Sequence, residues 1–576
     1  MHFDAIVVGS GFGGSVMAYR LAQAGKRVCL LERGKAFPPG SFPRTPDAMS
    51  KNFWSPRHKL HGMFDVWSFR SLAALVASGL GGGSLIYANV HIRKDEKWFV
   101  HETPDGAHED WPVTREQLDP HYTNVEAMLD VHPYPFTHAP YSNTAKTRAL
   151  KFAGETLAHN PNYKPGEIEW FLPNLAVTFG NQGETPVPGA QIREAIPNLH
   201  GLPRSTCRLC GECNVGCNYG SKNTLDYTYL SAAKVLPTPL SIFARCEVKS
   251  FRKREGARGY EVHYLDHSDA EEERAPARKK LTCDKLILAA GALGSPYLLL
   301  KNRANVPGIS ELLGTRFNGN GDILGTALKC RETRGGRSVP RRTEPSSGPV
   351  ISSALRVKDA LDGGGVRGRG FYVEDAGFPA FFQWMAAEAD LRWFERASHF
   401  ALRLVKLYLG FDRHPNLSQD FSKLVGEGLD VATLLPLLSM GRELPSGRMS
   451  LTGAGDLEID WRLADSADYF ARVRQVMKDV AASVGGEFID NPLWHLNQLI
   501  TVHPIGGCPM GRDAKHGVVG SNGQVFGCDD LYVADGSVMP GPVGPNPALT
   551  IAAVADYFAD QLIPEWNRGA LTATSP

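Results

Sequence analysis

Apolar positions near the start of the chain follow two different periods. Residues 5–8 (AIVV) are continuously apolar and predict a short buried strand. Residues 15–25 (SVMAYRLAQAG) have apolar side chains at helical spacing and predict a helix that ends at Gly25. Residues 27–32 (RVCLLE) predict a second strand, closed by Glu32. The order strand, helix, strand predicts a βαβ unit of an α/β protein.

The loop between this first strand and the helix carries Gly9, Gly11 and Gly14 in the spacing GxGxxG. In such a loop the first glycine permits a tight turn, the second lets the backbone approach a pyrophosphate, and the third allows close helix–strand packing. The free N–H groups of the helix N-terminus point at the phosphates, and Glu32 can accept a hydrogen bond from a ribose hydroxyl. The pattern predicts a dinucleotide site without distinguishing NAD from FAD. Its predicted contact residues are Gly9, Gly11, Phe12, Gly13, Gly14, Glu32 and Arg33.

Three later segments favour FAD. Residues 79–90 (GLGGGSLIYANV) contain a glycine cluster that lets the backbone lie flat against a bulky planar ligand. Residues 285–300 predict a buried strand beside the first one, followed by a helix starting near Ser295. Residues 531–534 predict a strand that delivers Asp535 to a polyol chain, and a helix from about Ala548 can offer N–H groups to a flavin carbonyl oxygen. The predicted contacts in and around these segments are Gly82, Gly83, Ser84, Asn89, Val248, Gly291, Asp535, Gly536, Asn546 and Pro547.

Composition and charge narrow the class of protein. Hydrophobic residues make up 43% of the 576 positions and charged residues 21%, which is typical of a globular protein with two or more domains. Lys plus Arg number 62 and Asp plus Glu 61, so we expect no nucleic-acid partner. Ten cysteines are too few for a secreted disulfide scaffold. Six of them are scattered and are predicted to be buried, reduced thiols: Cys29, Cys246, Cys283, Cys330, Cys508 and Cys528.

No signal peptide or membrane span is predicted. The N-terminus enters a strand at once, without a basic region and an apolar core before a cleavage site, so a cytoplasmic location is expected. The apolar run 71–90 is rich in glycine and is not interpreted as a transmembrane span. Residues 381–440 are apolar and helix-like, with interspersed charges. They predict either a lid for a greasy substrate, with peripheral contact to a membrane surface, or an amphipathic helical pair.

Seven segments, taken in their order along the chain, resemble the glucose–methanol–choline (GMC) flavin oxidoreductases. They are DAIVVGSGFGGS, GLGGGSLIYANV, WPVTREQLDPHY, GSKNTLDYTYL, LILAAGALGSP, HPIGGCPMG and YVADGSVMPGPVGPNPALTIAAVAD. Within that family LGTRFNGNGDILG and YVEDAGFPA are similar to segments of the cholesterol oxidase branch. The resemblance implies an α/β FAD-binding domain of Rossmann-like GMC type and a second α+β substrate domain built on an antiparallel sheet. Apart from His91, no histidine near the glycine cluster offers an obvious attachment point, so FAD is expected to be bound non-covalently.

The predicted domains are discontinuous along the chain. The FAD-binding domain is expected to comprise 1–35, 79–100, 205–330 and 500–576. Loops that cover the flavin are expected at 36–78. The substrate domain is expected to comprise 101–204 and 331–499, including the apolar segment 381–440.

Oxidation of an alcohol requires loss of the hydroxyl proton and transfer of a hydride from carbon to flavin N5. His503 is the candidate base, because imidazole accepts a proton near neutral pH and Pro504 and two glycines fix its loop. Asn546 is the candidate that orients the substrate oxygen. The resemblance implies that Glu374 acts as the base that moves a ring double bond in a sterol, or else as a group that orients the alcohol. The alternative for Glu374 is an acid on a solvated loop.

These residues leave three hypotheses for the function. The first is an FAD oxidase of a hydrophobic alcohol, sterol-like and with a 3-hydroxysteroid in first place, that uses oxygen as acceptor. The second is an FAD dehydrogenase of a long-chain, aryl or other alcohol that passes electrons to a non-oxygen acceptor, through an iron–sulfur cluster or a partner. The third is a flavin-binding subunit without turnover, against which the presence of both His503 and Asn546 speaks.

A loop of four cysteines precedes GSKNTLDYTYL. Its sequence CRLCGECNVGC places Cys207, Cys210, Cys213 and Cys217 at intervals that resemble the run of a bacterial ferredoxin, although Asn218 follows where those runs have proline. The residues allow an iron–sulfur cluster, a cramped zinc site, or a loop of thiols or disulfides without a cofactor. The sequence favours the cofactor-free loop, so no metal is predicted and the cluster is the minority interpretation.

Overall fold

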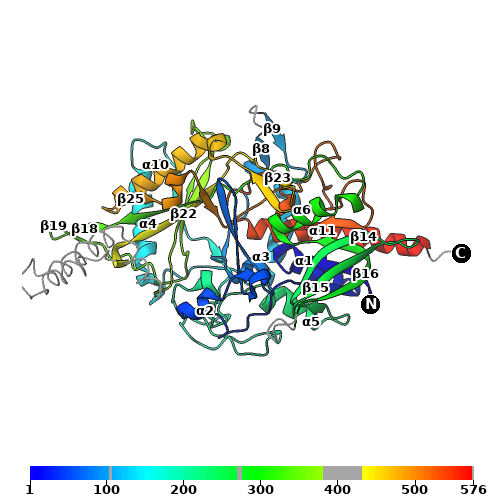
Figure 1. Ribbon diagram of the computed structural model, residues 1–576. Helices are drawn as coiled ribbons and strands as arrows, with labels where there is room; N and C mark the ends of the chain where they lie inside the picture. Colours follow the sequence, from blue (N-terminus) through cyan, green and yellow to red (C-terminus); the bar gives the residue numbers. More distant parts are fainter. Residues whose placement is uncertain (103–106, 269–274, 381–430, 574–576) are drawn as a thin grey trace, which may run out of the picture.

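The computed structural model describes residues 1–102, 107–268, 275–380 and 431–573. Two β-sheets dominate this part of the chain and lie at opposite ends of the molecule, the first beside the N-terminus and the second beside helices α4 (Ala145–Ala158) and α10 (Ala467–Ser483) (Figure 1). Smaller sheets and long loops connect them.

The first sheet is the predicted α/β unit. Its central strands run parallel, with β1 between β2 and β16 and with β27 on the other side of β16. An antiparallel hairpin of β14 and β15 extends it. Its strands are β13 (Ser241–Phe243), β2 (Val28–Leu31), β1 (His2–Val8), β16 (Ala277–Leu288), β15 (Tyr260–Asp266), β14 (Cys246–Lys253) and β27 (Leu531–Val533). The predicted pairing of the strand at 285–288 with the first strand is confirmed by the register Val8 opposite Leu288.

Helices α1 (Phe12–Gln23) and α11 (Ala548–Ala573) pack against each other beside this sheet, and α3 (Arg115–Met128) packs on α11. Their contact includes ion pairs of Arg20 with Asp556 and Asp560. The helix predicted at 15–25 begins earlier, at Phe12, because the glycines of the loop let its first turn lie against neighbouring backbone. The helix predicted near Ser295 likewise begins earlier, at Gly291, as α6 (Gly291–Lys301), whereas the predicted start of α11 is confirmed.

The second sheet is antiparallel throughout. It runs in the order β11 (Ile168–Phe171), β20 (Ala354–Val357), β21 (Phe371–Asp375), β22 (Leu435–Gly441), β17 (Ile323–Leu328) and β25 (Glu487–Asp490). Helices α4 and α10 share one hydrophobic core with it, to which β21 contributes Phe371 and Val373. Side chains alternate along a strand, so Tyr372 and Glu374 of β21 point to the opposite face.

Two expectations about this region are revised. Residues 435–440 were expected to be helix-like, but Leu435–Gly441 forms strand β22 in the middle of the second sheet. A short apolar run suits a strand buried on both faces as well as a helix, so its periodicity does not distinguish them. Residues 381–430 of the predicted lid lie outside the described residues. Ile323–Leu328 falls within the range predicted for the FAD-binding domain, yet it pairs with β22 and β25 of the second sheet.

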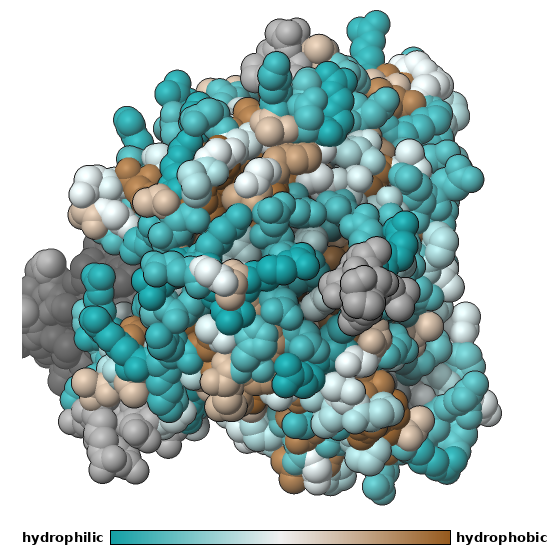
Figure 2. Space-filling model, turned by 90° about the vertical axis from the view of Figure 1, so that its right-hand side faces the viewer, coloured by the Kyte–Doolittle hydropathy of each residue, from teal (hydrophilic) through white to brown (hydrophobic). Residues whose placement is uncertain are grey.

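The surface beside the first sheet is mostly hydrophilic, with scattered hydrophobic residues (Figure 2). The apolar strands and the inward faces of α1, α3 and α11 form a core beneath it. Among the residues that the structure describes, no helix is long and apolar enough to cross a membrane. The six scattered cysteines are buried free thiols, as predicted.

Candidate active site

The glycine fingerprint is packed against two other strands. Gly9 has a φ of +101°, and a Cβ there would lie 2.3 Å from the carbonyl oxygen of Ala289, just after β16. A Cβ on Gly13 would lie 1.8 Å from the carbonyl oxygen of Ala534, just after β27, and one on Gly14 would lie 2.0 Å from the carbonyl oxygen of Gly9. Three of the four glycines are therefore required for close packing, which ties the loop to both later strands.

Gly11 differs from the other three glycines. Nothing lies within 4 Å of the position that its Cβ would take, so the chain is open there. Gly82 lies against the other side of Gly11, and Gly81 N donates to Ser10 Oγ over 3.0 Å. The fingerprint loop and the glycine cluster, distant in sequence, thus form one backbone surface with open space at Gly11. This is the arrangement that a bound pyrophosphate requires.

Glu32 lies at the end of β2, buried beside this loop. Its Oε2 accepts hydrogen bonds from Ser10 N (3.0 Å) and Ser10 Oγ (2.6 Å), and its Oε1 accepts one from Gly34 N (2.8 Å). Burial raises the pKa of this carboxyl, although the hydrogen bonds oppose that shift. The carboxylate therefore also holds the loop in shape, and its contact with a ribose stays a prediction. The side chain of Arg33 faces Asp65, and Arg33 Nη2 donates to Asp65 Oδ2 over 2.6 Å.

Asn89 is the clearest indication of a ligand-binding position. It is fully buried, its φ is +69°, and neither its Oδ1 nor its Nδ2 has a hydrogen-bond partner. A buried amide without partners is costly, so such a group in a native protein calls for a ligand or an ordered water. Ser84 differs, because its hydroxyl donates to Gly81 O (2.7 Å) and accepts from Leu225 N (3.1 Å).

The remaining predicted cofactor contacts lie around the same loop. Phe12 opens α1, with its ring edge-on to Tyr87 at 5.3 Å between centroids, and Gly83 lies in the short helix Gly82–Leu85. Val248 is buried on β14. Pro547 immediately precedes α11, whose first N–H groups are free of intrahelical partners as in any helix. Contact of each with the cofactor remains a prediction.

Asp535 follows β27 directly, and its carboxylate is engaged by the protein itself. Its Oδ2 accepts from Gly291 N (2.9 Å) and Ser295 Oγ (2.5 Å), and its Oδ1 accepts from Ser537 N (2.8 Å). The carboxylate thus joins Gly291 at the start of α6 to the C-terminal strand, and Gly536 begins the short helix Gly536–Val538 directly after it. The hydroxyl of Ser537 is buried without a partner. A polyol chain bound here would find Asp535 already oriented.

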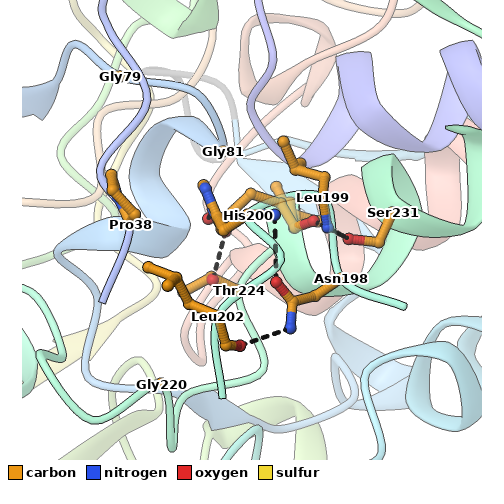
Figure 3. Close-up of polar contacts among 12 residues, drawn as sticks. Pro38, Gly79, Gly81, Asn198, Leu199, His200, Leu202, Gly220, Thr224 and Ser231 are labelled. Carbon is orange, nitrogen blue, oxygen red and sulfur yellow. Dashed lines mark hydrogen bonds and ion pairs between the residues drawn. The ribbon is translucent and has the colours of Figure 1, made fainter. Parts of the chain in front are cut away.

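A loop that the sequence did not single out lies near the glycine cluster (Figure 3). Leu199 N donates to Ser231 Oγ (2.9 Å), and Asn198 Nδ2 donates to Leu202 O (2.9 Å). His200 Nε2 lies 2.6 Å from Asp226 Oδ2, in a pair whose side chains are almost fully buried. Asp226 in turn lies beside Gly81. His200 stands alone in an irregular segment, so no spacing pattern could have indicated it.

His503 is held by a carboxylate. Its Nδ1 lies 2.7 Å from Asp322 Oδ1, while Asp322 Oδ2 accepts hydrogen bonds from Thr501 Oγ1, Val502 N and His503 N. A carboxylate at Nδ1 fixes the proton on that nitrogen and leaves Nε2 as the acceptor. The His503 side chain is 15% exposed, so the ring can still be reached. Asp322 was not among the predicted site residues, although the sequence NGNGD that contains it was noted.

Residues 318–322 link His503 to the C-terminal loop. Asn318 exchanges backbone hydrogen bonds of 3.0 Å with Ile505. Asn320 Nδ2 donates to Pro545 O (3.0 Å), and Gly544 N donates to Asn320 Oδ1 (2.9 Å). One short segment therefore positions both predicted catalytic loops, the one with His503 and the one that continues into Asn546.

Asn546 and Glu374 contact each other, although they were predicted independently. Asn546 Nδ2 donates to Glu374 Oε2 over 3.3 Å. Both side chains are buried, and Asn546 Oδ1 and Glu374 Oε1 have no partner. Burial raises the pKa of Glu374 to about 8, so this carboxyl is mostly protonated at neutral pH. The alternative of an acid on a solvated loop is wrong, because Glu374 is a fully buried residue of strand β21.

The residues present fit FAD. The backbone surface at Gly11 leaves space for the pyrophosphate, and the unpartnered amide of Asn89 and hydroxyl of Ser537 lie in the segments predicted to face the flavin. His91, the one candidate for covalent attachment, is buried, and burial lowers its pKa to about 3. Non-covalent attachment remains a prediction.

Comparisons with known proteins agree with this site. Two models described as GMC oxidoreductase match residues 199–308 and 445–555, and one described as NAD(P)-binding Rossmann-like domain matches residues 7–40. A cholesterol oxidase of Mycobacterium tuberculosis is 29% identical, over 97% of this chain and 90% of its own length. A cholesterol oxidase of Acinetobacter baumannii is 27% identical, over 96% and 93%. The crystal structure of pyridoxine 4-oxidase from Mesorbium loti has a TM-score of 0.55 at 17% identity, covering 97% of this chain and 99% of that one.

Fold, site and comparisons together define an FAD-dependent oxidoreductase that acts on alcohols. Models of the GMC oxidoreductase family match two parts of the chain, and the chain is similar to cholesterol oxidases. The predicted fold class is confirmed: a Rossmann-like domain that binds FAD stands beside a substrate domain with an antiparallel sheet.

Proposed function

We propose that this enzyme oxidises a hydrophobic, sterol-like alcohol, with a 3-hydroxysteroid in first place, and uses oxygen as its electron acceptor. The observation that carries the proposal is the juxtaposition of Asn546 and Glu374, two buried side chains that contact each other and keep one unpartnered oxygen each. Unpartnered oxygens on two buried side chains that contact each other suit a substrate hydroxyl. The similarity to two cholesterol oxidases supports the substrate class.

His503 takes the hydroxyl proton of the alcohol at Nε2. Asp322 holds the proton on Nδ1 and stabilises the imidazolium that forms, as a carboxylate does behind a catalytic histidine. FAD, when bound, supplies the acceptor for the hydride that leaves the carbinol carbon. Proton and hydride together account for the two hydrogens that the alcohol loses in becoming a carbonyl.

Asn546 orients the substrate. Its Nδ2 donates one hydrogen to Glu374, so the second hydrogen of the same amide is left to donate to the substrate oxygen, whose own proton goes to His503. Through Asn320, the segment 318–322 fixes the loop that leads to Asn546. The neutral amide of Asn546 thus positions the alcohol oxygen without adding a charge to the site before the reaction.

Glu374 acts on a ring double bond where the substrate has one. As a base it needs the ionised form, and with a pKa of about 8 a minor part of the carboxyl is ionised at neutral pH. The product would then be an isomerised enone. Without such a double bond, neutral Glu374 orients the substrate together with Asn546.

An apolar substrate suits the surroundings of Glu374. Glu374 lies directly opposite Leu438 of the neighbouring strand β22. Tyr372, two residues before Glu374 on β21, points to the same face. Tyr372, Leu438 and Met440 belong to one buried hydrophobic cluster. A substrate with a hydroxyl group at one end of an apolar skeleton can place the skeleton against such side chains and the hydroxyl oxygen at Asn546.

A panel of sterols, long-chain alcohols, aryl alcohols and sugars tests the substrate class. Each substrate is offered under air, with hydrogen peroxide as readout, and without oxygen, with an artificial dye as acceptor. The proposal expects 3-hydroxysteroids to give the highest kcat/KM and peroxide in an amount equal to the product. Preference for a sugar or a small polar alcohol would contradict it.

A second candidate is a dehydrogenase that passes electrons to an acceptor other than oxygen. The observation that favours it is the gathering of four cysteines around one pocket next to the glycine cluster of the FAD site. Turnover with the dye but no peroxide under air would select this candidate over the oxidase.

A further inference from the structure

The loop of four cysteines folds around one pocket. All four thiols line it, and the space between protein atoms there amounts to about 330 Å³, including part that is open to solvent. We call it the cysteine pocket, and its cysteines are Cys207, Cys210, Cys213 and Cys217. All four are free thiols in the structure, so the disulfide loop that the sequence allowed is not formed.

The backbone of this loop is shaped to bring the thiols together. Leu209, Gly211 and Gly216, which lie between the cysteines, all have φ between +60° and +88°. A leucine in this left-handed region is unfavourable and persists only where surrounding structure enforces it. Gly348 supplies that enforcement, because its N–H donates to Leu209 O (3.1 Å) and its carbonyl accepts from Gly211 N (2.9 Å).

A second anchor holds the loop to the N-terminal part of the chain. Arg44 Nε donates to Glu212 Oε2 (2.8 Å), and Arg44 NH2 donates to Gly216 O (2.6 Å). The side chain of Asn218 exchanges two hydrogen bonds of 2.9 Å with the backbone of Phe42. The pocket is thus built by three distant parts of the chain, which is more than a surface loop needs.

Two buried ammonium groups lie next to this pocket. Lys222 Nζ donates to three carbonyl oxygens, those of Leu85, Tyr87 and Cys213, and Lys146 Nζ donates to those of Pro349 and Val350. Lys222 and Pro349 line the pocket themselves.

Both lysines are at most 1% exposed, and the carboxylates that act on them electrostatically include Asp375 for Lys146 and Asp226 for Lys222. A buried ammonium group stays charged at lower cost where further negative charge lies close by.

The four thiols line the pocket without converging on one point. A tetrahedral zinc site holds its sulfurs about 2.3 Å from one point. Among the described residues, no three His, Cys, Asp or Glu side chains converge in a way that could hold one metal ion. In an iron–sulfur cluster each cysteine of a cuboidal core binds a different iron, so the sulfurs surround a space and do not meet at a point.

We infer that the cysteine pocket binds an iron–sulfur cluster through the thiolates of Cys207, Cys210, Cys213 and Cys217. Its thiolates and sulfides give such a cluster net negative charge, which Lys146 and Lys222 offset. The spacing of the first three cysteines is that of a ferredoxin, and the structure adds the pocket, the enforced loop and the buried cations. This departs from the cofactor-free loop that the sequence alone favoured.

The site lies against the FAD site. Lys222 joins Cys213 to Leu85 and Tyr87, which belong to the glycine-rich segment 79–90, and the short helix Cys213–Val215 contacts the short helix Gly82–Leu85. The inference does not rest on the proposed sterol substrate or on the identity of the electron acceptor, because cluster content is measured without turnover.

The test begins with the full chain, FAD included, purified without oxygen and then incubated with ferrous iron and sulfide under reducing conditions. After desalting, we expect about four irons and four acid-labile sulfides per chain. We also expect an EPR signal in one oxidation state of the cluster. Absorbance should extend to wavelengths longer than those of the flavin bands. Zinc in place of iron, iron without sulfide, or neither would overturn the inference.

Two matched variants locate the cluster. Cys213→Ala is expected to lose the sulfide and most of the iron while it keeps its FAD absorbance, which shows that it has folded. Cys528→Ala removes a cysteine that is equally free but lies outside the pocket, and it should keep both at the wild-type level. If Cys213→Ala fails to fold, Cys210→Ser, at a half-buried position, provides the same measurement. Unchanged iron and sulfide in a folded pocket variant would contradict the assignment.

Discussion

The nucleotide-binding loop and the proposed catalytic centre of this enzyme are built in opposite ways. At residues 9–14 backbone atoms form the site. Carbonyl oxygens just after two other strands leave no room for a Cβ on Gly9 or Gly13. At the catalytic centre four distant segments contribute one or two side chains each, and Asn546 and Glu374 keep unpartnered oxygens. The first region is close-packed except at Gly11, and the second, as proposed, is completed by its substrate. Substitutions should therefore cost folding and cofactor in the first and turnover in the second.

The largest effect is expected from Gly13→Ala. Its new Cβ would lie 1.8 Å from the carbonyl oxygen of Ala534, so α1 must move away from β27. We expect a loss of about 4 kcal/mol or more in the free energy of unfolding, together with loss of bound FAD. Thermal unfolding and flavin absorbance measure both.

Gly11→Ala is the matched control, because nothing lies within 4 Å of the Cβ that it adds. It should fold like the wild type and lose only affinity for FAD, since the methyl group fills the space kept for the pyrophosphate. Equal instability of both variants would show that the fingerprint is not built by close packing.

His503→Ala should leave folding and FAD content unchanged and lower kcat by about 10²- to 10⁴-fold, the range of a general base. The side chain is partly exposed and its removal buries no unpaired group except Asp322. Stopped-flow reduction of the flavin under anaerobic conditions reports the step directly. Flavin reduction at the wild-type rate would rule out His503 as the base.

Asp322→Asn should reduce kcat less, by about 10²-fold, with FAD retained. The amide keeps an acceptor for one neighbour but loses the charge that stabilises protonated His503, and its NH2 group disturbs the donors at Thr501 and Val502. The pH dependence of kcat separates the two roles of the residue. A purely structural residue would lower stability without moving that profile.

The smallest effect is expected from Glu374→Gln. At pH 7 the wild-type carboxyl is mostly neutral, because its pKa is about 8, so alcohol oxidation should change by less than about tenfold. Isomerisation of a ring double bond should disappear, since glutamine cannot act as a base. Separate assays of ketone formation and of conjugated enone absorbance measure the two steps.

The same variant tests the pKa of Glu374 through stability. The folded value of about 8 lies above the ordinary 4.5, so the folded state holds a proton that the unfolded state has released between these pH values. Wild-type stability should therefore fall as pH rises through this window, by up to about 1.4 kcal/mol per pH unit from this group. Glu374→Gln should flatten that fall, as urea unfolding at pH 5 and pH 8 would show. Equal slopes in both proteins would contradict the raised pKa.

The sequence by itself determined the elements whose signals are local. The strand, glycine loop and helix at residues 5–25 carry their periodicity and turn residues side by side, so the βαβ unit and its fingerprint could be predicted from neighbouring positions. His503, Asn546 and Glu374 were named from short motifs and from the chemistry of alcohol oxidation. Their separation along the chain gave no information about their contacts.

Tertiary structure decided which of those residues meet. Asp322 behind His503, the pair of Asn546 and Glu374, and the support of Asp226 by His200 all join residues from different segments, and the sheet registers that bring them together are set by long-range packing. Strand β22 was mistaken for helix because an apolar run buried on both faces has no period of its own. The four cysteines illustrate both contributions. Their spacing is visible in the sequence. The pocket and the two buried lysines beside it exist only because chain segments far apart in sequence fold against one loop.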